Sequence, residues 1–144
     1  MIFPDANLLL YAEDSLSAHH EAARTWWDGV LSGSEPVHLC WPVLQAFLRI
    51  ATNPRLHDRP LTPEEAIQRV QSWIDQPCVY VVGPSENHWR IFQTQVRESG
   101  AMGNLVPDAH LAALAIEHGS TLYSADRDFA RFPTLRWVDP LADK

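Results

Sequence analysis

Short apolar runs alternate with longer stretches of mixed character along this chain of 144 residues. The short runs are bounded by polar residues, glycine or proline, and several are rich in β-branched residues, which is typical of buried strands. The runs predicted to be strands are 1–5, 37–40, 79–82, 121–123 and 135–138. Five runs of this kind predict one central sheet.

The longer stretches have the length and the end signals of helices. Thr62 is a good N-cap because Pro63 follows at the first helical position and Glu65 is placed to close a capping box. Glycines at positions 33, 100 and 119 are placed to end three other helices. The helical segments predicted are a turn at 7–11 and longer helices at 17–31, 42–52, 63–75, 85–99 and 107–118.

This alternation of strands and helices predicts a fold in the α/β class. Strands separated by helices are joined by right-handed crossovers, which give a mostly parallel sheet covered by helices on both faces. We therefore expect residues 1–144 to form one domain, an α/β/α sandwich. In open sheets of this kind, ligands bind beyond the carboxyl ends of the strands, so residues just after each strand are the first functional candidates.

Composition narrows the class of protein. No apolar run approaches the roughly 18 to 20 residues needed to span a bilayer, and the N-terminus does not resemble a secretory leader. We therefore expect a cytoplasmic protein without a membrane partner. The two cysteines, Cys40 and Cys78, lack metal-ligand spacing and lie in apolar segments, so we expect buried free thiols.

The charged residues argue against lysine-dependent chemistry and against simple nucleic-acid binding. The one lysine is Lys144, which argues against a Walker A loop, a Schiff-base enzyme and phosphoaspartate chemistry that needs an internal lysine. The net charge of −7 argues against simple nucleic-acid binding, which depends on basic residues meeting phosphates. A clustered acidic site is neutralised when it holds a cation, and an acidic surface can attract a basic protein partner.

Four aspartates are predicted to converge at the carboxyl edge of the sheet. Asp5 follows the first strand, Asp126 and Asp128 follow the strand at 121–123, and Asp108 begins the helix before that strand. Crowded carboxylates raise each other's pKa and are tolerated mainly when a hard cation lies between them. Oxygen ligands favour Mg²⁺ or Mn²⁺, and such an ion activates water for hydrolysis of a phosphodiester.

Each of these acids also has a purely structural interpretation. Asp5 is placed to cap the next turn, Asp108 to complement a helix dipole, and Asp126 with Asp128 to shape a polar turn. Two neighbours, Asn7 and Ser124, are weaker candidates for orienting a carboxylate or a metal-bound water, and an Asx turn explains Asn7 equally well. Spacing alone leaves these interpretations open.

Other polar and aromatic residues carry less information. His110 lies close to Asp108 in sequence, but a surface position is the simpler expectation, and no serine or cysteine has a legible base beside it. The tryptophans in predicted helices are expected in the core or in a dimer contact: Trp26, Trp27, Trp73 and Trp89. Two basic stretches could meet phosphates or form solvated faces: Arg49, Arg55, His57 and Arg59, and then Arg127, Arg131 and Arg136.

Four sequence blocks together resemble the VapC-type toxins that carry a PIN domain. In chain order they are Pro-Asp-Ala-Asn-Leu-Leu-Leu-Tyr (4–11), Phe-Leu-Arg-Ile-Ala-Thr-Asn-Pro-Arg (47–55), Pro-Asp-Ala-His-Leu-Ala-Ala-Leu-Ala (107–115) and Ser-Ala-Asp-Arg-Asp-Phe (124–129). The resemblance runs through nearly the whole chain. It implies a Mg²⁺- or Mn²⁺-dependent endoribonuclease, usually a homodimer, that cleaves RNA and is inhibited by a cognate VapB-type antitoxin.

The resemblance also assigns the acidic site, with one departure. It matches Asp5, Asp108 and Asp126 to catalytic and metal-binding positions and adds Asp128 as a metal ligand. Many members carry a glutamate immediately before the segment that matches residues 47–49, where this chain has Ala46 with Gln45 beside it. Either Gln45 holds a metal-bound water without charge, or the aspartates suffice, or the site is weak.

Two other functions remain open at this point. A catalytically weak or inactive PIN domain that binds RNA or a protein would explain Ala46 and the acidic net charge. A phosphatase with an aspartate nucleophile fits Asp5, but Asn7 replaces the second acid that such enzymes need and no internal lysine is present. A metal-dependent ribonuclease accounts for more of the sequence than either.

Overall fold

The computed structural model describes residues 1–142, so Lys144 lies outside the described residues. Its five strands form one sheet in the order β3-β2-β1-β4-β5, and every pairing is parallel. The strands are β1 (Ile2–Pro4), β2 (Val37–Cys40), β3 (Val79–Val82), β4 (Thr121–Tyr123) and β5 (Trp137–Val138). All five predicted strands are confirmed, although the first and the last are shorter than 1–5 and 135–138.

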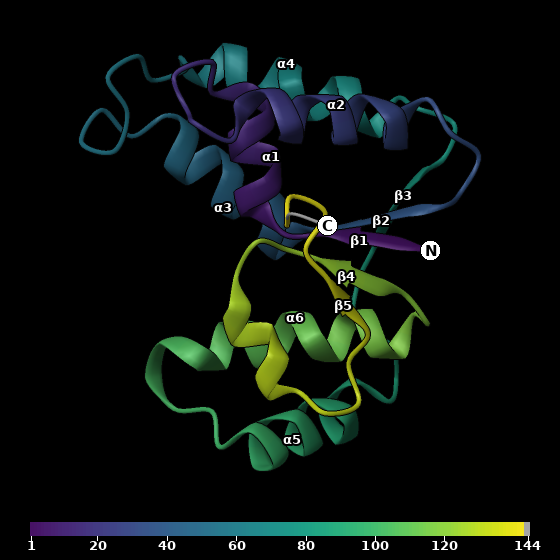
Figure 1. Cartoon of the computed structure of the whole chain (residues 1–144). Helices are drawn as coiled ribbons and strands as arrows, with labels where there is room; N and C mark the ends of the chain where they lie inside the picture. The colour runs from purple at the N-terminus through teal and green to yellow at the C-terminus, as the bar shows by residue number, and fades with distance from the viewer. Residues whose placement is uncertain (143–144) are drawn as a thin grey trace.

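Helices cover both faces of this sheet, which confirms the predicted α/β/α sandwich (Figure 1). One layer contains α1 (Ala6–Glu13), α2 (His20–Leu31), α3 (Trp41–Ala51) and α4 (Pro63–Ile74). The other layer contains α5 (His88–Ser99) and α6 (Val106–Glu117), which pack against each other. Two short 3₁₀ helices, η1 (Gly103–Leu105) and η2 (Arg127–Arg131), precede α6 and follow β4.

Helix boundaries follow local hydrogen bonds. The capping box predicted at the start of α4 is present, since Glu65 N donates to Thr62 Oγ1 at 3.1 Å and Thr62 N donates to Glu65 Oε1 at 3.0 Å. Gly100 ends α5 in the left-handed conformation at φ 67°, which a residue with a side chain rarely adopts. These two predictions are therefore confirmed in detail.

Two predicted helix starts are wrong by three residues each. α2 begins at His20 rather than residue 17, and α5 begins at His88 rather than residue 85. In both cases the serine hydroxyl accepts a bond from the backbone N–H two residues later, from His19 to Ser17 and from Asn87 to Ser85. Serine that bonds in this way stabilises a turn instead of a helix N-terminus.

Different side chains fill the two layers. The layer of α1 to α4 is built around large aromatic rings, with Trp73 in edge contact with Phe47 at a centroid distance of 4.7 Å and with Trp27 at 5.8 Å. The opposite layer is built around α6, whose buried residues are almost all small: Ala109, Ala112, Ala113, Leu114 and Ala115. Small side chains let α6 approach the sheet closely, which brings its N-terminus to the strand ends.

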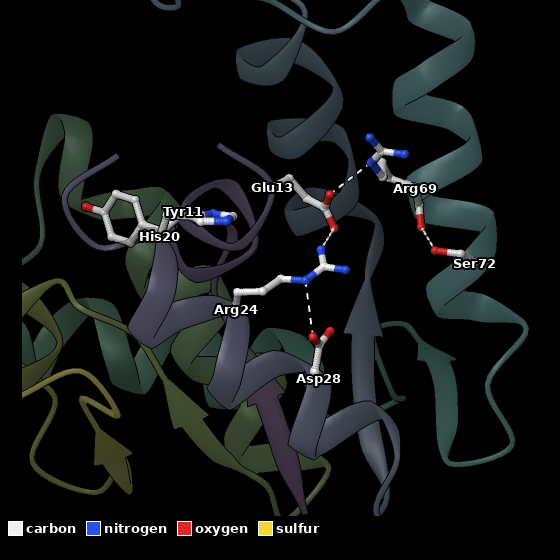
Figure 2. Close-up of polar contacts among 7 residues, drawn as sticks. All are labelled: Tyr11, Glu13, His20, Arg24, Asp28, Arg69 and Ser72. Carbon is white, nitrogen blue, oxygen red and sulfur yellow. Dashed lines mark hydrogen bonds and ion pairs between the residues drawn. The ribbon is translucent and has the colours of Figure 1, made fainter. Parts of the chain in front are cut away.

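A buried carboxylate joins three helices in the aromatic layer (Figure 2). The Glu13 side chain, at the end of α1, is only 8% exposed and lies between an arginine of α2 and an arginine of α4. Arg24 Nη1 donates to Glu13 Oε1 at 3.1 Å, and Arg69 Nε donates to Glu13 Oε2 at 2.9 Å. Arg24 also donates to Asp28 Oδ2 at 3.2 Å, which fixes its guanidinium along α2.

Replacing Glu13 with glutamine should lower the free energy of unfolding by about 1–3 kcal/mol, because an amide group would face two guanidinium groups with too few acceptors. Both arginines are nearly half exposed, so water limits the loss. Chemical denaturation measures the change. Arg24→Ala is the matched control and should lose less than about 1 kcal/mol. A Glu13→Gln protein as stable as wild type would contradict this role.

Among residues 1–142, no helix is both long and apolar enough to cross a lipid bilayer.

Candidate metal centre

The carboxyl ends of three adjacent strands place Cys40, Asp5 and Ser124 in one row. Ile2 pairs with Val37 and Pro4 pairs with Tyr123, so the next residues along each strand lie level with one another. The backbone N–H of Asp5 continues the ladder by donating to Tyr123 O at 2.8 Å. Asp5 therefore stands at the centre of the functional edge that the sequence predicted.

Ser124 is the hydrogen-bond hub of this row. It is fully buried, and its hydroxyl donates to Asp5 Oδ2 at 2.7 Å. The same oxygen accepts from Asn7 Nδ2 at 3.2 Å and from the backbone N–H of Asp126 at 3.0 Å. One hydroxyl thus sets the positions of the first aspartate, the predicted orienting amide and the loop that carries the next aspartate.

The other carboxylate oxygen of Asp5 is also occupied by the fold. Asp5 is the N-cap of α1, and its Oδ1 accepts from Ala6 N at 2.7 Å. The capping interpretation and the functional interpretation of Asp5 are therefore compatible, because one carboxylate caps the helix while it faces the other acids.

Three further carboxylates form a compact group beside this row. Asp108, Asp126 and Asp128 each offer an oxygen, and these oxygens lie within 4.8 Å of one another. Asp108 comes from the first turn of α6, while Asp126 caps η2 by accepting from Asp128 N at 2.9 Å. Two layers of the sandwich thus contribute to one acidic group. Asp5 lies outside this closest set, although its charge helps to raise the pKa of Asp108 and the charge of Asp126 helps to raise the pKa of Asp5.

The electrostatics of the cluster show strain that a cation would relieve. Partial burial, followed by repulsion from Asp126, Asp5 and Asp128, raises the pKa of Asp108 to about 6. Burial also raises the pKa of Asp5, and the hydrogen bonds from Ser124 and Ala6 partly oppose that rise. Near neutral pH the cluster therefore holds several negative charges at an energetic disadvantage.

The donor set fits a hard divalent cation. All the candidate ligands are oxygens, and neither cysteine nor histidine joins them among the described residues. Asn7 adds a second observation, because its Oδ1 is buried and has no hydrogen-bond partner within residues 1–142. An unpartnered buried oxygen beside crowded carboxylates matches the needs of a hydrated cation.

Comparison with known proteins identifies the family of the chain. The family model described as PIN domain matches residues 2–135. Ribonuclease VapC37 of Mycobacterium tuberculosis is 45% identical over 138 residues, which cover 96% of each chain. The chain belongs to the PIN-domain VapC family. The predicted resemblance is therefore confirmed.

Solved structures with low sequence identity share the PIN fold. Mycobacterium tuberculosis VapC20, described as a sarcin-ricin loop cleaving toxin, superposes with a TM-score of 0.67 at 19% identity, covering 94% of this chain and 99% of that one. A toxin–antitoxin complex from Klebsiella pneumoniae contains a chain with a TM-score of 0.63 at 16% identity, covering 97% and 98%. At these identities the superpositions establish the fold alone.

In this PIN domain, the position of the absent family glutamate does not supply another acid. Ala46 is half-buried on α3, and the neighbouring Gln45 is exposed. The Gln45 side chain makes no hydrogen bond within residues 1–142. A role for Gln45 in holding a metal-bound water stays a prediction, and the acidic group rests on aspartates.

His110 and the two cysteines are not part of the acidic group. His110 is half-buried between α5 and α6, where its Nδ1 lies 3.1 Å from His88 Nε2. His88 Nδ1 in turn lies 2.7 Å from Glu117 Oε2. Cys40 and Cys78 are buried free thiols, as predicted, and burial raises the pKa of Cys40 to about 12. Cys40 is therefore not a nucleophile near neutral pH.

One residue at the functional edge escaped sequence reasoning. Trp41 directly follows β2, as Asp5 follows β1 and Ser124 follows β4, and its side chain is 63% exposed. Ligands bind beyond the carboxyl ends of strands in open sheets, so the position of Trp41 directly after a predicted strand was a signal for it. Trp89 is 68% exposed, so it is not in the core, and its expected role in a dimer contact stays a prediction.

Proposed function

We propose that this PIN domain is a divalent-metal-dependent endoribonuclease and the toxin of a type II toxin–antitoxin pair. The observation that carries the proposal is the acidic group itself: oxygens of Asp108, Asp126 and Asp128 lie within 4.8 Å of one another, beside Asp5, in a chain 45% identical to a ribonuclease VapC. No other group of potential ligands of that kind is present in residues 1–142.

The residues of the cluster would have distinct tasks in the reaction. Asp108, Asp126 and Asp128 would hold Mg²⁺ or Mn²⁺, and Asp5 would add a fourth carboxylate beside them. A bound cation lowers the pKa of water and stabilises negative charge on the phosphodiester in the transition state. Asp5, Asp108 and Asp126 are the catalytic residues in this proposal, and Ser124 is a positioning residue because it acts through Asp5 and Asp126.

The hydrogen bonds already present give these tasks a physical basis. Ser124 and Ala6 hold the Asp5 carboxylate in one orientation, so no side-chain motion is needed to present its charge. Asp126 Oδ1 is fixed by Asp128 N, and its second oxygen makes no hydrogen bond within residues 1–142. Asn7 has a free Oδ1 to accept a hydrogen bond from a water in the site.

Partners follow from the same proposal. RNA is the substrate, and a VapB-type antitoxin is the inhibitor; the likeness to a chain in a toxin–antitoxin complex supports that partner. A net charge of −7 favours a basic antitoxin segment over a second acidic protein. Homodimer formation and a cytoplasmic location stay predictions from the family resemblance.

Cleavage of a mixed cellular RNA pool tests the proposal. Wild-type protein with Mg²⁺ or Mn²⁺ should cut at few sites. EDTA removes the cation and Asp5→Asn removes a carboxylate charge beside it, so each should reduce the rate by about 100-fold or more. Asp58→Asn is the matched control: Asp58 is an exposed aspartate outside the cluster, and its loss should leave cleavage unchanged.

Ala46 favours a second candidate, a PIN domain that binds RNA or a protein without cutting. The family glutamate is missing, and the structure offers only Gln45, an uncharged exposed side chain, next to that position. If folded wild-type protein leaves the whole RNA pool intact and isothermal titration with Mn²⁺ detects no binding, this second function replaces the first.

A further inference from the structure

One face of α3 presents three chemically different side chains to solvent. Trp41, Gln45 and Arg49 are spaced four residues apart, so they lie on the same side of the helix, and all three are exposed. The opposite side contains the buried residues of α3, which are Val43, Leu44, Phe47 and Ala51. Packing therefore explains one side of the helix and leaves the side that begins with Trp41 unexplained.

The N-terminal end of this face, at Trp41, lies beside the acidic group and Asp5. Cys40, the residue before Trp41, lies level with Asp5 in the sheet. The first turns of α1 and α3 and the end of β4 meet at one side of the sheet in Figure 1. Trp41 is therefore adjacent to the row that holds Asp5 and Ser124.

The C-terminal half of α3 and the segment after it carry positive charge that makes no ion pair within residues 1–142. Arg49 on α3, with Arg55 and Arg59 in the segment that follows, makes no ion pair and no side-chain hydrogen bond within residues 1–142. By contrast, Arg24 and Arg69 are both paired with Glu13. In a chain with 18 acidic residues and a net charge of −7, an unpaired arginine on the same face of α3 as Trp41 points to an anionic ligand for that face.

We propose that the Trp41–Gln45–Arg49 face of α3 binds the RNA strand as it leaves the acidic centre, with Trp41 stacked on an unpaired base. This inference rests on the proposed ribonuclease function and names the surface that holds its substrate. An exposed indole suits base stacking, an amide suits hydrogen bonds to a base edge, and a guanidinium suits a phosphate. An unpaired strand is required, because bases within a duplex are not available for stacking on a side chain.

Equilibrium binding in EDTA tests this surface without cleavage. The probe is a fluorescein-labelled single-stranded RNA of mixed sequence, followed by anisotropy with wild-type protein, Trp41→Ala and Trp89→Ala. Trp41→Ala should weaken binding by roughly 5- to 100-fold, the range for loss of one base–aromatic stack. Trp89→Ala removes an equally exposed tryptophan from α5 and should bind like wild type. Equal affinities for all three proteins would overturn the proposal.

Fluorescence quenching separates stacking from a general effect on the surface. Stacking on a base quenches an indole, so the unlabelled RNA should quench wild type and Trp89→Ala more than Trp41→Phe. Trp41→Phe retains an aromatic ring and should recover most of the affinity that Trp41→Ala loses. If quenching is unchanged in Trp41→Phe, Trp41 does not contact the base.

A second copy of this chain is the competing occupant of the face. Light scattering on wild type and Trp41→Ala should give the same mass if RNA is the occupant. A mass that falls only in Trp41→Ala would assign the face to a dimer contact and overturn the proposal. Steady-state cleavage adds a further distinction, since Trp41→Ala should raise KM and leave kcat nearly unchanged.

The outcomes also distinguish this inference from the proposed function. RNA binding that depends on Trp41, with no cleavage by wild type in Mg²⁺ or Mn²⁺, would support the binding face and reject the nuclease. Metal-dependent cleavage with the same KM in wild type and Trp41→Ala would support the nuclease and reject the face.

Discussion

Asp108→Asn should abolish metal-dependent RNA cleavage and, in the absence of metal, make the protein more stable than wild type near pH 7.5. The rate should fall by about 100-fold or more, because Asp108 is one of three carboxylates that share the proposed cation. Stability should rise by about 1 kcal/mol, because the folded protein no longer contains a carboxylate whose pKa has been raised to about 6, and water screens part of the repulsion at this half-buried group. A gain in stability with a loss of function is typical of a strained active site.

The sign of the pH dependence follows from the direction of that shift. Asp108 binds its proton more tightly in the folded protein than in the unfolded chain, so its contribution to stability is present below pH 3.8 and is lost as pH rises through about 6. The stability difference between Asp108→Asn and wild type should therefore be small at pH 4 and reach its maximum above pH 7.

Thermal unfolding in EDTA at several pH values measures this difference. Added Mg²⁺ or Mn²⁺ should raise the Tm of wild type and have a smaller effect on Asp108→Asn, since the ion binds the folded state through these carboxylates. Asp75→Asn, a change at an exposed helix end, is the control and should show neither effect. A wild-type protein that is more stable than Asp108→Asn in EDTA at pH 7.5 would contradict the electrostatic strain.

Ser124→Ala should combine a loss of stability with a large loss of activity. The variant leaves Asp5 Oδ2, Asn7 Nδ2 and the Asp126 N–H without the hydroxyl that joins them, which lowers the free energy of unfolding by about 1–3 kcal/mol. The kcat should fall by about 10- to 100-fold, as expected when a group that orients metal-binding carboxylates is removed. Because Ser124 lowers the pKa of Asp5, the acid limb of the pH profile should also move to higher pH.

Ser120→Ala is the matched control for this experiment. Ser120 and Ser124 flank β4 at its two ends, and both are buried. Ser120 Oγ lies 2.6 Å from His38 Nδ1, at the end of the strand away from the acids. Ser120→Ala should lower stability to a similar degree with kcat and the pH profile unchanged. If both variants lose activity in proportion to stability, Ser124 is a structural residue only.

Local sequence signals predicted most of the fold. The strands at 37–40, 79–82 and 121–123 have the predicted bounds, because each is a short apolar run with a clear turn on both sides. The errors lie at helix starts, where Ser17 and Ser85 offered an N-cap but instead stabilise a preceding turn. A serine hydroxyl that accepts a bond from the backbone N–H two residues later is compatible with a helix N-terminus and with a turn. Tertiary packing decides which of the two forms.

The acidic site, like the fold, was predicted in part from the sequence. The positions of Asp5, Asp126 and Asp128 after strands predicted that they would meet, because carboxyl ends of parallel strands share an edge. The hub role of Ser124 could not be predicted, since its three partners come together only through the pairing of β1 with β4. The cluster of His110 with His88 and Glu117 could not be predicted, because it depends on how α5 packs against α6.

The sequence by itself determined the alternation of strands and helices, the parallel sandwich and the aspartates at its functional edge, because these depend on periodicity, end signals and chain order. Only the tertiary structure decided which of those carboxylates share a cation-sized space, which hydroxyl orders them, and that Trp41 and Trp89 are exposed while Trp27 and Trp73 are buried. Such outcomes depend on contacts between segments far apart in the chain, and no local pattern encodes the distance between two side chains that different elements contribute.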